Sequence, residues 1–170
     1  EAHYDLRLAD VKSHPDGKPV VSVDVTSYAQ VLEAARGMDA LMNFTVVRPD
    51  PVQSFHVNTR GAWNVMKAAV ELGIKKVIHT GPQLVRGVYD HDFDIVDVPG
   101  APGSQWYYAF TKTLGMEICR IYARAYDIQT IFFVFNGIRP KPTEQVVGQD
   151  FPPFTITHED LAHACRLALE

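Results

Sequence analysis

The sequence predicts an α/β fold built on a doubly wound parallel sheet. Five short, strongly apolar segments have the character of strands, and four of them are followed by segments with helical spacing of their apolar residues. Strands that alternate with helices in this way form a parallel sheet with helices on both faces. No internal repeat, low-complexity segment or linker divides the chain, so residues 1–170 are expected to form one domain.

The first two strands are expected at residues 4–10 and 20–25. Apolar and polar residues alternate in the first segment, and a loop rich in Pro, Gly and Lys separates it from the second. Each of these strands ends near an acidic residue. Ser27 is then a suitable N-cap for a helix that Gly37 closes.

The middle of the chain predicts two buried strands with a long helix between them. Residues 40–47 form a continuous apolar run, and two prolines break the chain after it. Residues 52–72 have the apolar spacing of a helix, and Gly73 ends it. The short apolar segment 77–80 is expected to be the next strand.

Two long irregular segments interrupt the second half of the chain. Residues 81–103 are rich in Pro, Gly and Asp and carry no periodic pattern, which is more loop than a compact domain normally holds without a use, and residues 139–157 are a second irregular segment. We expect these segments to form a very small substrate lobe. Between them, residues 104–126 predict a helix and 128–135 a buried strand, and a last helix starts near His158.

Charge and composition exclude several classes of partner. Acidic residues outnumber basic residues by 20 to 16, and no Lys/Arg run provides the basic surface that nucleic acid requires. No apolar stretch approaches the ~20 residues that span a bilayer, and no signal peptide opens the chain, so no membrane partner is expected. Cys119 and Cys165 have neither disulfide-framework nor zinc spacing, which favours a reducing cytoplasm.

The last helix superficially resembles a zinc-binding helix, because His158 and His163 flank a Glu-Asp-Leu-Ala segment. The zinc motif places its two histidines four residues apart. Five residues rotate the two side chains ~140° apart on a helix, so one ion cannot use both readily. No metal site is expected.

Tyr108 and Lys112 are the strongest candidates for chemistry. Residues four apart share one face of a helix, so the phenol and the ammonium group can point into one pocket. A neighbouring cation favours phenolate and is expected to lower the pKa of Tyr108, as a general base near neutral pH requires. Taken alone, the same pair is also typical of the exposed face of an amphipathic helix.

The order of several motifs gives this pair a context. Along the chain stand Asp10 at a strand end, Asp24 at the next, Asn58-Thr-Arg-Gly61-Ala-Trp-Asn64 in a helix, Thr80 at a turn, Tyr108 with Lys112, and His158-Glu-Asp160-Leu-Ala162. In this order, over nearly its whole length, the chain resembles the extended short-chain dehydrogenase/reductase family, the NAD-dependent sugar epimerases and dehydratases. The resemblance implies a Rossmann-like fold and NAD as cofactor.

The family normally opens with a strand and a Gly-rich turn before the position of Asp10. Neither the Gly-x-Gly-x-x-Gly pattern nor the P-loop pattern occurs in this sequence. We therefore expect the sequence to be a fragment that lacks this first strand and turn, roughly 25 residues for a usual βαβ unit.

The resemblance assigns cofactor contacts to particular residues. Asp10 would accept the adenosine ribose hydroxyls, which favours NAD over NADP because a 2′-phosphate would meet a like charge. The other expected contacts are Asp24 and Val25 beside the adenine, Phe44, Thr45 and Val46 along the dinucleotide, and Asn58 near the active site. Each of these has a plain structural alternative, such as a solvated acid at a strand end, a helix cap or a core hydrogen bond.

The resemblance also assigns the catalytic roles. Tyr108 would be the acid/base, and Lys112 would hold the nicotinamide ribose. The family's catalytic Ser/Thr position reads Pro82, which offers neither hydroxyl nor N–H. Thr80 lies two residues earlier, faces the same side of an extended strand and could supply the hydroxyl, or it is only a strand-end residue.

A narrower likeness points to the substrate. The stretch 128–142 is similar to uronate dehydrogenases, compact members of the family that oxidise sugar acids with NAD. Gln83 and Asn136 stand at positions where the family contacts substrate, although the family has other residues there. The arginine that the family carries beyond its Pro-Lys-Pro reads Val146 here, so a clamp for a carboxylate is not evident.

Three functions remain open from the sequence. The first is an NAD-dependent oxidoreductase, epimerase or dehydratase that acts on a sugar, sugar acid or nucleotide sugar. The second is a catalytically impaired NAD(H)-binding sensor or regulatory protein, which Pro82 motivates. The third is a purely structural protein. The resemblance also permits a homodimer, because helices of this type often pair in family dimers.

Overall fold

The computed structural model describes residues 4–82, 104–142 and 155–170. Its strands are β1 (Ala9–Asp10), β2 (Val21–Ser22), β3 (Ala40–Asn43), β4 (Lys76–Pro82), β5 (Gln129–Phe135), β6 (Gly137–Arg139) and β7 (Thr155–Thr157). Its helices are α1 (Tyr28–Ala35), α2 (Pro51–Ser54), the π-helix η1 (Phe55–Arg60), α3 (Gly61–Leu72), α5 (Ser104–Tyr126) and α6 (His158–Leu169). All the strand pairs are parallel, in three groups: β1–β2, β3–β4–β5 and β6–β7.

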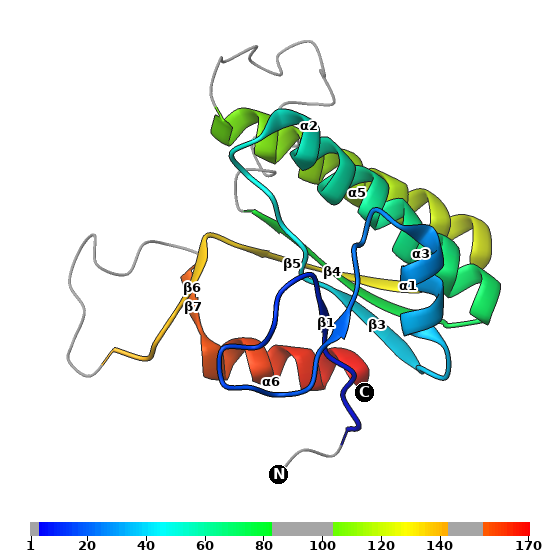
Figure 1. The fold of residues 1–170 in the computed structure, drawn as a ribbon, viewed down its shortest axis with the longest axis horizontal. Coiled ribbons are helices and arrows are strands. Elements are labelled where there is room, and N and C mark those ends of the chain that lie inside the picture. Colours follow the sequence, from blue (N-terminus) through cyan, green and yellow to red (C-terminus); the bar gives the residue numbers. More distant parts are fainter. Residues whose placement is uncertain (1–3, 83–103, 143–154) are drawn as a thin grey trace.

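Helices lie on both sides of the central three-stranded sheet. Helices α3 and α5 pack along one side of it, with α1 against α3, and α6 lies on the other side (Figure 1). This arrangement confirms the predicted α/β fold with parallel strands. The predicted helix limits agree closely for α1, α5 and α6, and Ser27 is the N-cap residue of α1.

The strands differ from expectation in length and grouping. β1 and β2 have two residues each. Among the described residues these two strands pair only with each other, and the residues of both are exposed. β3 ends at Asn43 instead of running to residue 47. The reason is local: the Asn43 side-chain oxygen accepts hydrogen bonds from the backbone N–H and the hydroxyl of Thr45 at 3.1 and 2.7 Å, which turns the chain out of the ladder.

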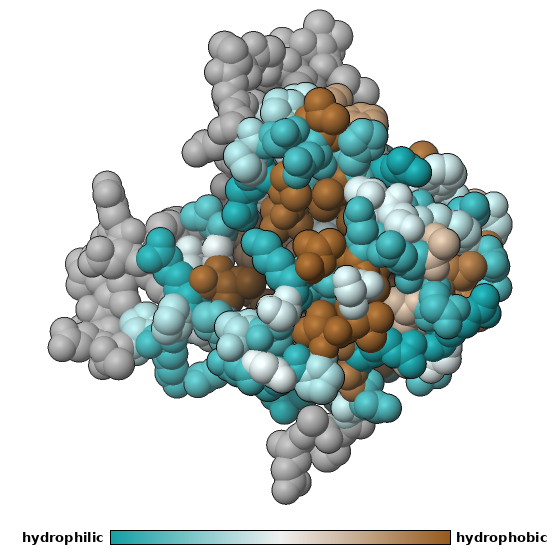
Figure 2. All heavy atoms as spheres, in the orientation of Figure 1, coloured by the Kyte–Doolittle hydropathy of each residue, from teal (hydrophilic) through white to brown (hydrophobic). Residues whose placement is uncertain are grey.

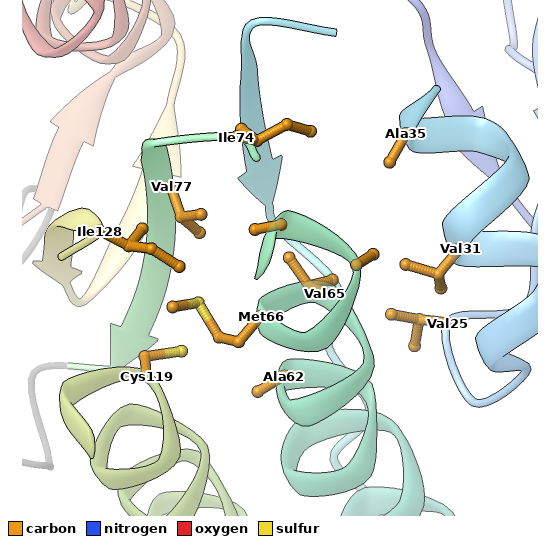
Figure 3. Packing of buried hydrophobic residues seen from close by; sticks show 12 residues of the cluster. Val25, Val31, Ala35, Ala62, Val65, Met66, Ile74, Val77, Cys119 and Ile128 are labelled. Atoms are coloured by element: carbon orange, nitrogen blue, oxygen red, sulfur yellow. The ribbon is translucent and has the colours of Figure 1, made fainter. Parts of the chain in front are cut away.

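The hydrophobic core lies between the central sheet and the helices on one side. Met66 of α3 and Cys119 of α5 meet Val77 of β4 there, and Ile128, the residue before β5, closes the cluster (Figure 3). On the opposite side of α3 the cluster continues to α1 and to Val25, which follows β2. The core thereby fixes α3 and α5 relative to the carboxyl ends of β3 and β4.

The expected helix over residues 52–72 is present but contains a π-helical turn. Residues 51–72 are helical throughout, η1 interrupts the α-helix, and Gly73 ends it in the left-handed conformation at φ 71°. A π-turn inside an α-helix often marks a functional position. Here it holds Asn58, whose backbone carbonyl faces Gly115 of α5 so closely that a Cβ on Gly115 would lie 2.4 Å from the oxygen.

This close approach predicts that Gly115→Ala destabilises the protein. The added methyl group would meet backbone, which cannot rotate away, so the loss should exceed the gain in helix propensity and amount to about 1–2 kcal/mol. Urea unfolding followed by circular dichroism measures it. Gly137→Ala is the control, because its Cβ would meet nothing within 4 Å; equal stability of both variants and the parent would refute the packing argument.

Candidate active site

Helix α5 places Tyr108 and Lys112 side by side at the carboxyl ends of β3 and β4. Both side chains are buried, with 8% and 1% of their surface exposed. The Lys112 ammonium group donates to the carbonyl of Thr45 at 2.7 Å and to the carbonyl of Thr80 at 3.3 Å. The lysine therefore ties α5 to the ends of two neighbouring strands.

Burial dominates the electrostatics of this pair. It lowers the pKa of Lys112 to about 8, because the charged form loses its hydration. Burial also raises the pKa of Tyr108, against the opposing effect of Arg48. The expectation that Lys112 lowers the pKa of Tyr108 is thus wrong for this structure: the net shift is upward, and the cation that acts on the phenol is Arg48.

Arg48 was missed in the sequence. Its guanidinium carbon lies 5.0 Å from the centroid of the Tyr108 ring, within the range of a cation–π contact. Its charge and a side-chain hydrogen bond both favour the phenolate form and so oppose the rise in the pKa of Tyr108. The sequence did offer one signal. Arg48 directly follows the apolar run 40–47, which contains β3, and ligands of parallel sheets bind at the carboxyl ends of the strands.

Asn58 links the segment before Arg48 to α5. Its side-chain nitrogen donates to the carbonyl of Val47 at 2.9 Å and to the hydroxyl of Thr111 at 3.0 Å. Its side-chain oxygen accepts from the backbone N–H of Val47 at 3.3 Å. Thr111 directly precedes Lys112, so the structure brings Asn58 next to the Tyr108–Lys112 pair.

Thr80 joins this group by its backbone rather than by its side chain. Its hydroxyl donates to the carbonyl of Asn43 at 3.3 Å, and its own carbonyl accepts from Lys112. Pro82 is the last residue of β4 and pairs with Phe135. No hydrogen bond between the Thr80 and Tyr108 side chains is found.

Asn43 and His79 form a buried polar pair that was also missed. They are register partners in β3 and β4, with 3% and 1% of their surface exposed. The Asn43 Nδ2 and His79 Nε2 atoms are buried with no hydrogen-bond partner among the described residues. Burial, with a smaller contribution from the charge of Lys112, lowers the pKa of His79 to about 3.

The expected cofactor residues at the other strand ends remain separate from this group. Asp10 is exposed at the end of β1, where one carboxylate oxygen accepts the backbone N–H of Lys12 at 3.0 Å. One oxygen of Asp24 accepts from both the N–H and the hydroxyl of Thr26 at 2.8 Å, and the carbonyl of Val25 accepts from Asn64 at 2.8 Å.

Two of the residues expected to contact the cofactor are apolar, and they face solvent between β3 and α2. Phe44 and Val46 have 37% and 42% of their surface exposed. Figure 2 shows apolar side chains gathered along the middle of one face within a polar rim. Exposed apolar side chains at strand ends are suited to contact with a planar ligand.

Of the two residues expected to contact the substrate, one lies within the described part of the chain. Asn136 is exposed between β5 and β6. Gln83 lies outside the described residues, as does most of the expected lobe at 81–103 and 139–157. Within the described ranges, no group of three or more His, Cys, Asp and Glu side chains could hold a metal ion, and no helix is long and apolar enough to cross a membrane.

The burial of His79 predicts a specific dependence of stability on pH. Between pH 6.5 and about 3 the unfolded chain binds a proton at this residue that the folded protein does not bind. The free energy of unfolding should therefore fall as the pH falls through this window, by about 1.4 kcal/mol for each pH unit at most. His79→Phe should flatten that slope in urea unfolding at pH 4 to 7.

The exposed histidine His56 provides the control for this measurement. His56→Gln should keep the pH dependence of the parent protein. If His79→Phe keeps it as well, then burial of a neutral imidazole at position 79 is not what weakens the fold in acid.

Comparisons with known proteins identify the family of this chain. The family model "NAD dependent epimerase/dehydratase family" matches residues 2–147. A uronate dehydrogenase from Pseudomonas putida is 28% identical over 144 residues, which cover 81% of this chain and 53% of the relative, so the chain spans about half the length of that protein.

Solved structures show the same fold. A mutated uronate dehydrogenase superposes with a TM-score of 0.72 at 22% identity, over 95% of this chain and 59% of the other. A glucuronic acid dehydrogenase from Chromohalobacter salexigens gives a TM-score of 0.69 at 19% identity, over 95% and 61% of the two chains. The chain described here belongs to the NAD-dependent epimerase/dehydratase family, a Rossmann-like enzyme family whose cofactor is NAD.

Proposed function

We propose that this protein is an NAD-dependent oxidoreductase that acts on a sugar acid, with Tyr108 as its acid/base. The observation that supports this most directly is the buried Tyr108–Lys112 pair at the carboxyl ends of β3 and β4. The similarity to uronate and glucuronic acid dehydrogenases supports the substrate class.

The residues present fit NAD by the chemistry of their groups. The exposed carboxylate of Asp10, at the end of β1, is an acceptor for ribose hydroxyls. The Lys112 ammonium group keeps a third N–H beyond its two bonds to backbone carbonyls and can donate it to the nicotinamide ribose. Phe44 and Val46 offer exposed apolar surface after β3. When bound, NAD⁺ supplies the acceptor for the hydride of the substrate carbon.

Tyr108 handles the proton of the same substrate group. As phenolate it accepts the proton of the substrate hydroxyl while the adjacent C–H bond breaks. Burial disfavours the phenolate, and the nearby Arg48 favours it. Arg48, rather than Lys112, therefore acts on the proton affinity of Tyr108, and Lys112 fixes the position of α5 against the strands.

The position that reads Pro82 limits what can orient the substrate oxygen. Proline offers no donor, and the Thr80 hydroxyl is engaged by the carbonyl of Asn43 at 3.3 Å. For Thr80 to serve catalysis, its hydroxyl must exchange that long hydrogen bond for the substrate. We retain Thr80 as the candidate on that condition.

A second candidate is an NAD(H)-binding sensor with little turnover. Pro82 in place of a hydroxyl-bearing residue is the observation that favours it. Both candidates require cofactor binding, so turnover distinguishes them.

We further propose a cytoplasmic location, because the thiols of Cys119 and Cys165 are free. We also propose a homodimer, because the exposed Ile121 and Tyr126 on α5 offer apolar surface for a second copy.

Substitution of the tyrosine tests the proposed chemistry. Tyr108→Phe should lower kcat by about 10²- to 10⁴-fold, because a positioned general base is lost, while the affinity for NAD⁺ stays the same. Stopped-flow or steady-state NADH absorbance with sugar acids measures it. Tyr126→Phe, at the exposed end of α5, should behave like the parent; a Tyr108→Phe variant with full turnover would eliminate the proposed role.

Calorimetric titration with NAD⁺ and NADP⁺ tests the role of Asp10. The parent should bind NAD⁺ more tightly than NADP⁺ by about tenfold or more, since a 2′-phosphate would meet the Asp10 carboxylate. Asp10→Asn should reduce this preference, whereas Asp16→Asn in the exposed loop should leave it unchanged. If neither nucleotide binds the parent protein, the whole proposal fails.

A further inference from the structure

Arg48 stands out because it is exposed and still contacts the buried tyrosine. Its guanidinium group lies over the Tyr108 ring at 5.0 Å. Among residues 4–82, 104–142 and 155–170, no carboxylate lies within ion-pair distance of it. An arginine beside a candidate catalytic group, with no acid to neutralise it, is available for an anionic ligand.

The backbone that carries Arg48 is held rigidly. The carbonyl of the preceding Val47 accepts from the buried side chains of Ser54 at 3.0 Å and Asn58 at 2.9 Å, and its N–H donates to Asn58 at 3.3 Å. Beyond Arg48, the Asp50 side chain caps α2 by accepting from the backbone N–H of Gln53 at 2.8 Å. Both flanks of the arginine are thereby fixed, which preorganises its position.

We propose that Arg48 binds the carboxylate of a sugar-acid substrate while a hydroxyl of the same sugar contacts Tyr108. A sugar acid carries its hydroxyls and its carboxylate on one small ring, so a substrate with a hydroxyl at Tyr108 keeps its carboxylate within a few ångströms of that residue. A planar guanidinium group can donate two parallel hydrogen bonds to a carboxylate. The assignment rests on the proposed function and deepens it by naming the residue that selects an acid over a neutral sugar.

The position of Arg48 argues against the phosphates of NAD as its partner. An anion bound at Arg48 would lie next to Tyr108, the residue that exchanges a proton with the substrate. That anion is therefore a group of the substrate and not a phosphate of the cofactor. Arg48 also supplies the selectivity that the family's arginine position, which reads Val146, does not.

The test compares sugars that differ only in the acid group. Glucuronate and galacturonate are assayed against glucose and galactose at saturating NAD⁺, with the full chain and its Arg48→Gln and Arg48→Lys variants. Arg48→Gln should lower kcat/KM for the uronates by about 10- to 100-fold more than for the neutral sugars, the value of a lost charge-assisted hydrogen-bonded pair. A loss common to both classes of sugar reports the separate effect of Arg48 on the phenolate form of Tyr108. Arg48→Lys should retain part of the selectivity, because it keeps the charge but not the fork.

A binding measurement supports the kinetics and does not depend on turnover. In calorimetry with NADH present, glucuronate or galacturonate should bind the parent more tightly than Arg48→Gln by a similar factor, while NADH itself binds both equally. Arg124→Gln is the matched control, since this exposed arginine lies in the last turn of α5, ~24 Å along the helix from Tyr108.

The outcomes separate this inference from the proposed function. If Arg48→Gln weakens neutral and acidic sugars equally, the arginine acts on Tyr108 alone and the assignment is overturned. If the parent oxidises or binds only neutral sugars, the assignment is overturned and the oxidoreductase remains. If NADH binds but no uronate binds the parent, the assignment is overturned as well; if neither cofactor nor sugar binds, the proposed function falls with it.

Discussion

The side chain of Asn58 is the interaction on which the geometry of the site depends. It joins the backbone at Val47 to Thr111 of α5 by hydrogen bonds to both. The π-turn η1 gives it this place, and the absent side chain of Gly115 lets η1 and α5 approach each other at backbone distance. Because Asn58 is buried, its hydrogen bonds have no competition from water, and a loss of any of them would leave a buried polar group unpaired.

Much of the fold follows from pattern, and the exceptions follow from side-chain contacts that no pattern encodes. The limits of α1, α5 and α6 agree with the apolar spacing, because this signal is local, and α6 also begins with a capping box of Thr157 and Asp160. The early end of β3 depends on the Asn43 side chain, which binds its own following backbone. The π-turn likewise depends on contacts with α5, whose residues stand about fifty positions later in the chain.

The residues of the candidate active site also fall into two groups, those that the sequence predicts and those whose contacts depend on the fold. Tyr108 and Lys112 could be found from their spacing, since four residues on a helix fix a shared face. The sequence places Arg48 at the end of an apolar run but not over Tyr108, because that position results from the anchoring of Val47 by residues of α2 and η1. The contacts of the Lys112 ammonium group with the carbonyls of Thr45 and Thr80 could not be predicted from the sequence either, because they depend on how α5 lies across the sheet.

The candidate active site is locally positive, although the protein as a whole is negatively charged. The protein carries a net charge of −4, yet Lys112 and Arg48 stand near one tyrosine, and no carboxylate of the described residues forms an ion pair with either. Two uncompensated cations near a buried phenol create a positive potential, which burial strengthens because water cannot screen it fully. Arg48 favours both an anionic ligand and the phenolate form of Tyr108, against the burial that raises the pKa of this tyrosine, so the residue that would bind a sugar acid also assists the base that would deprotonate it.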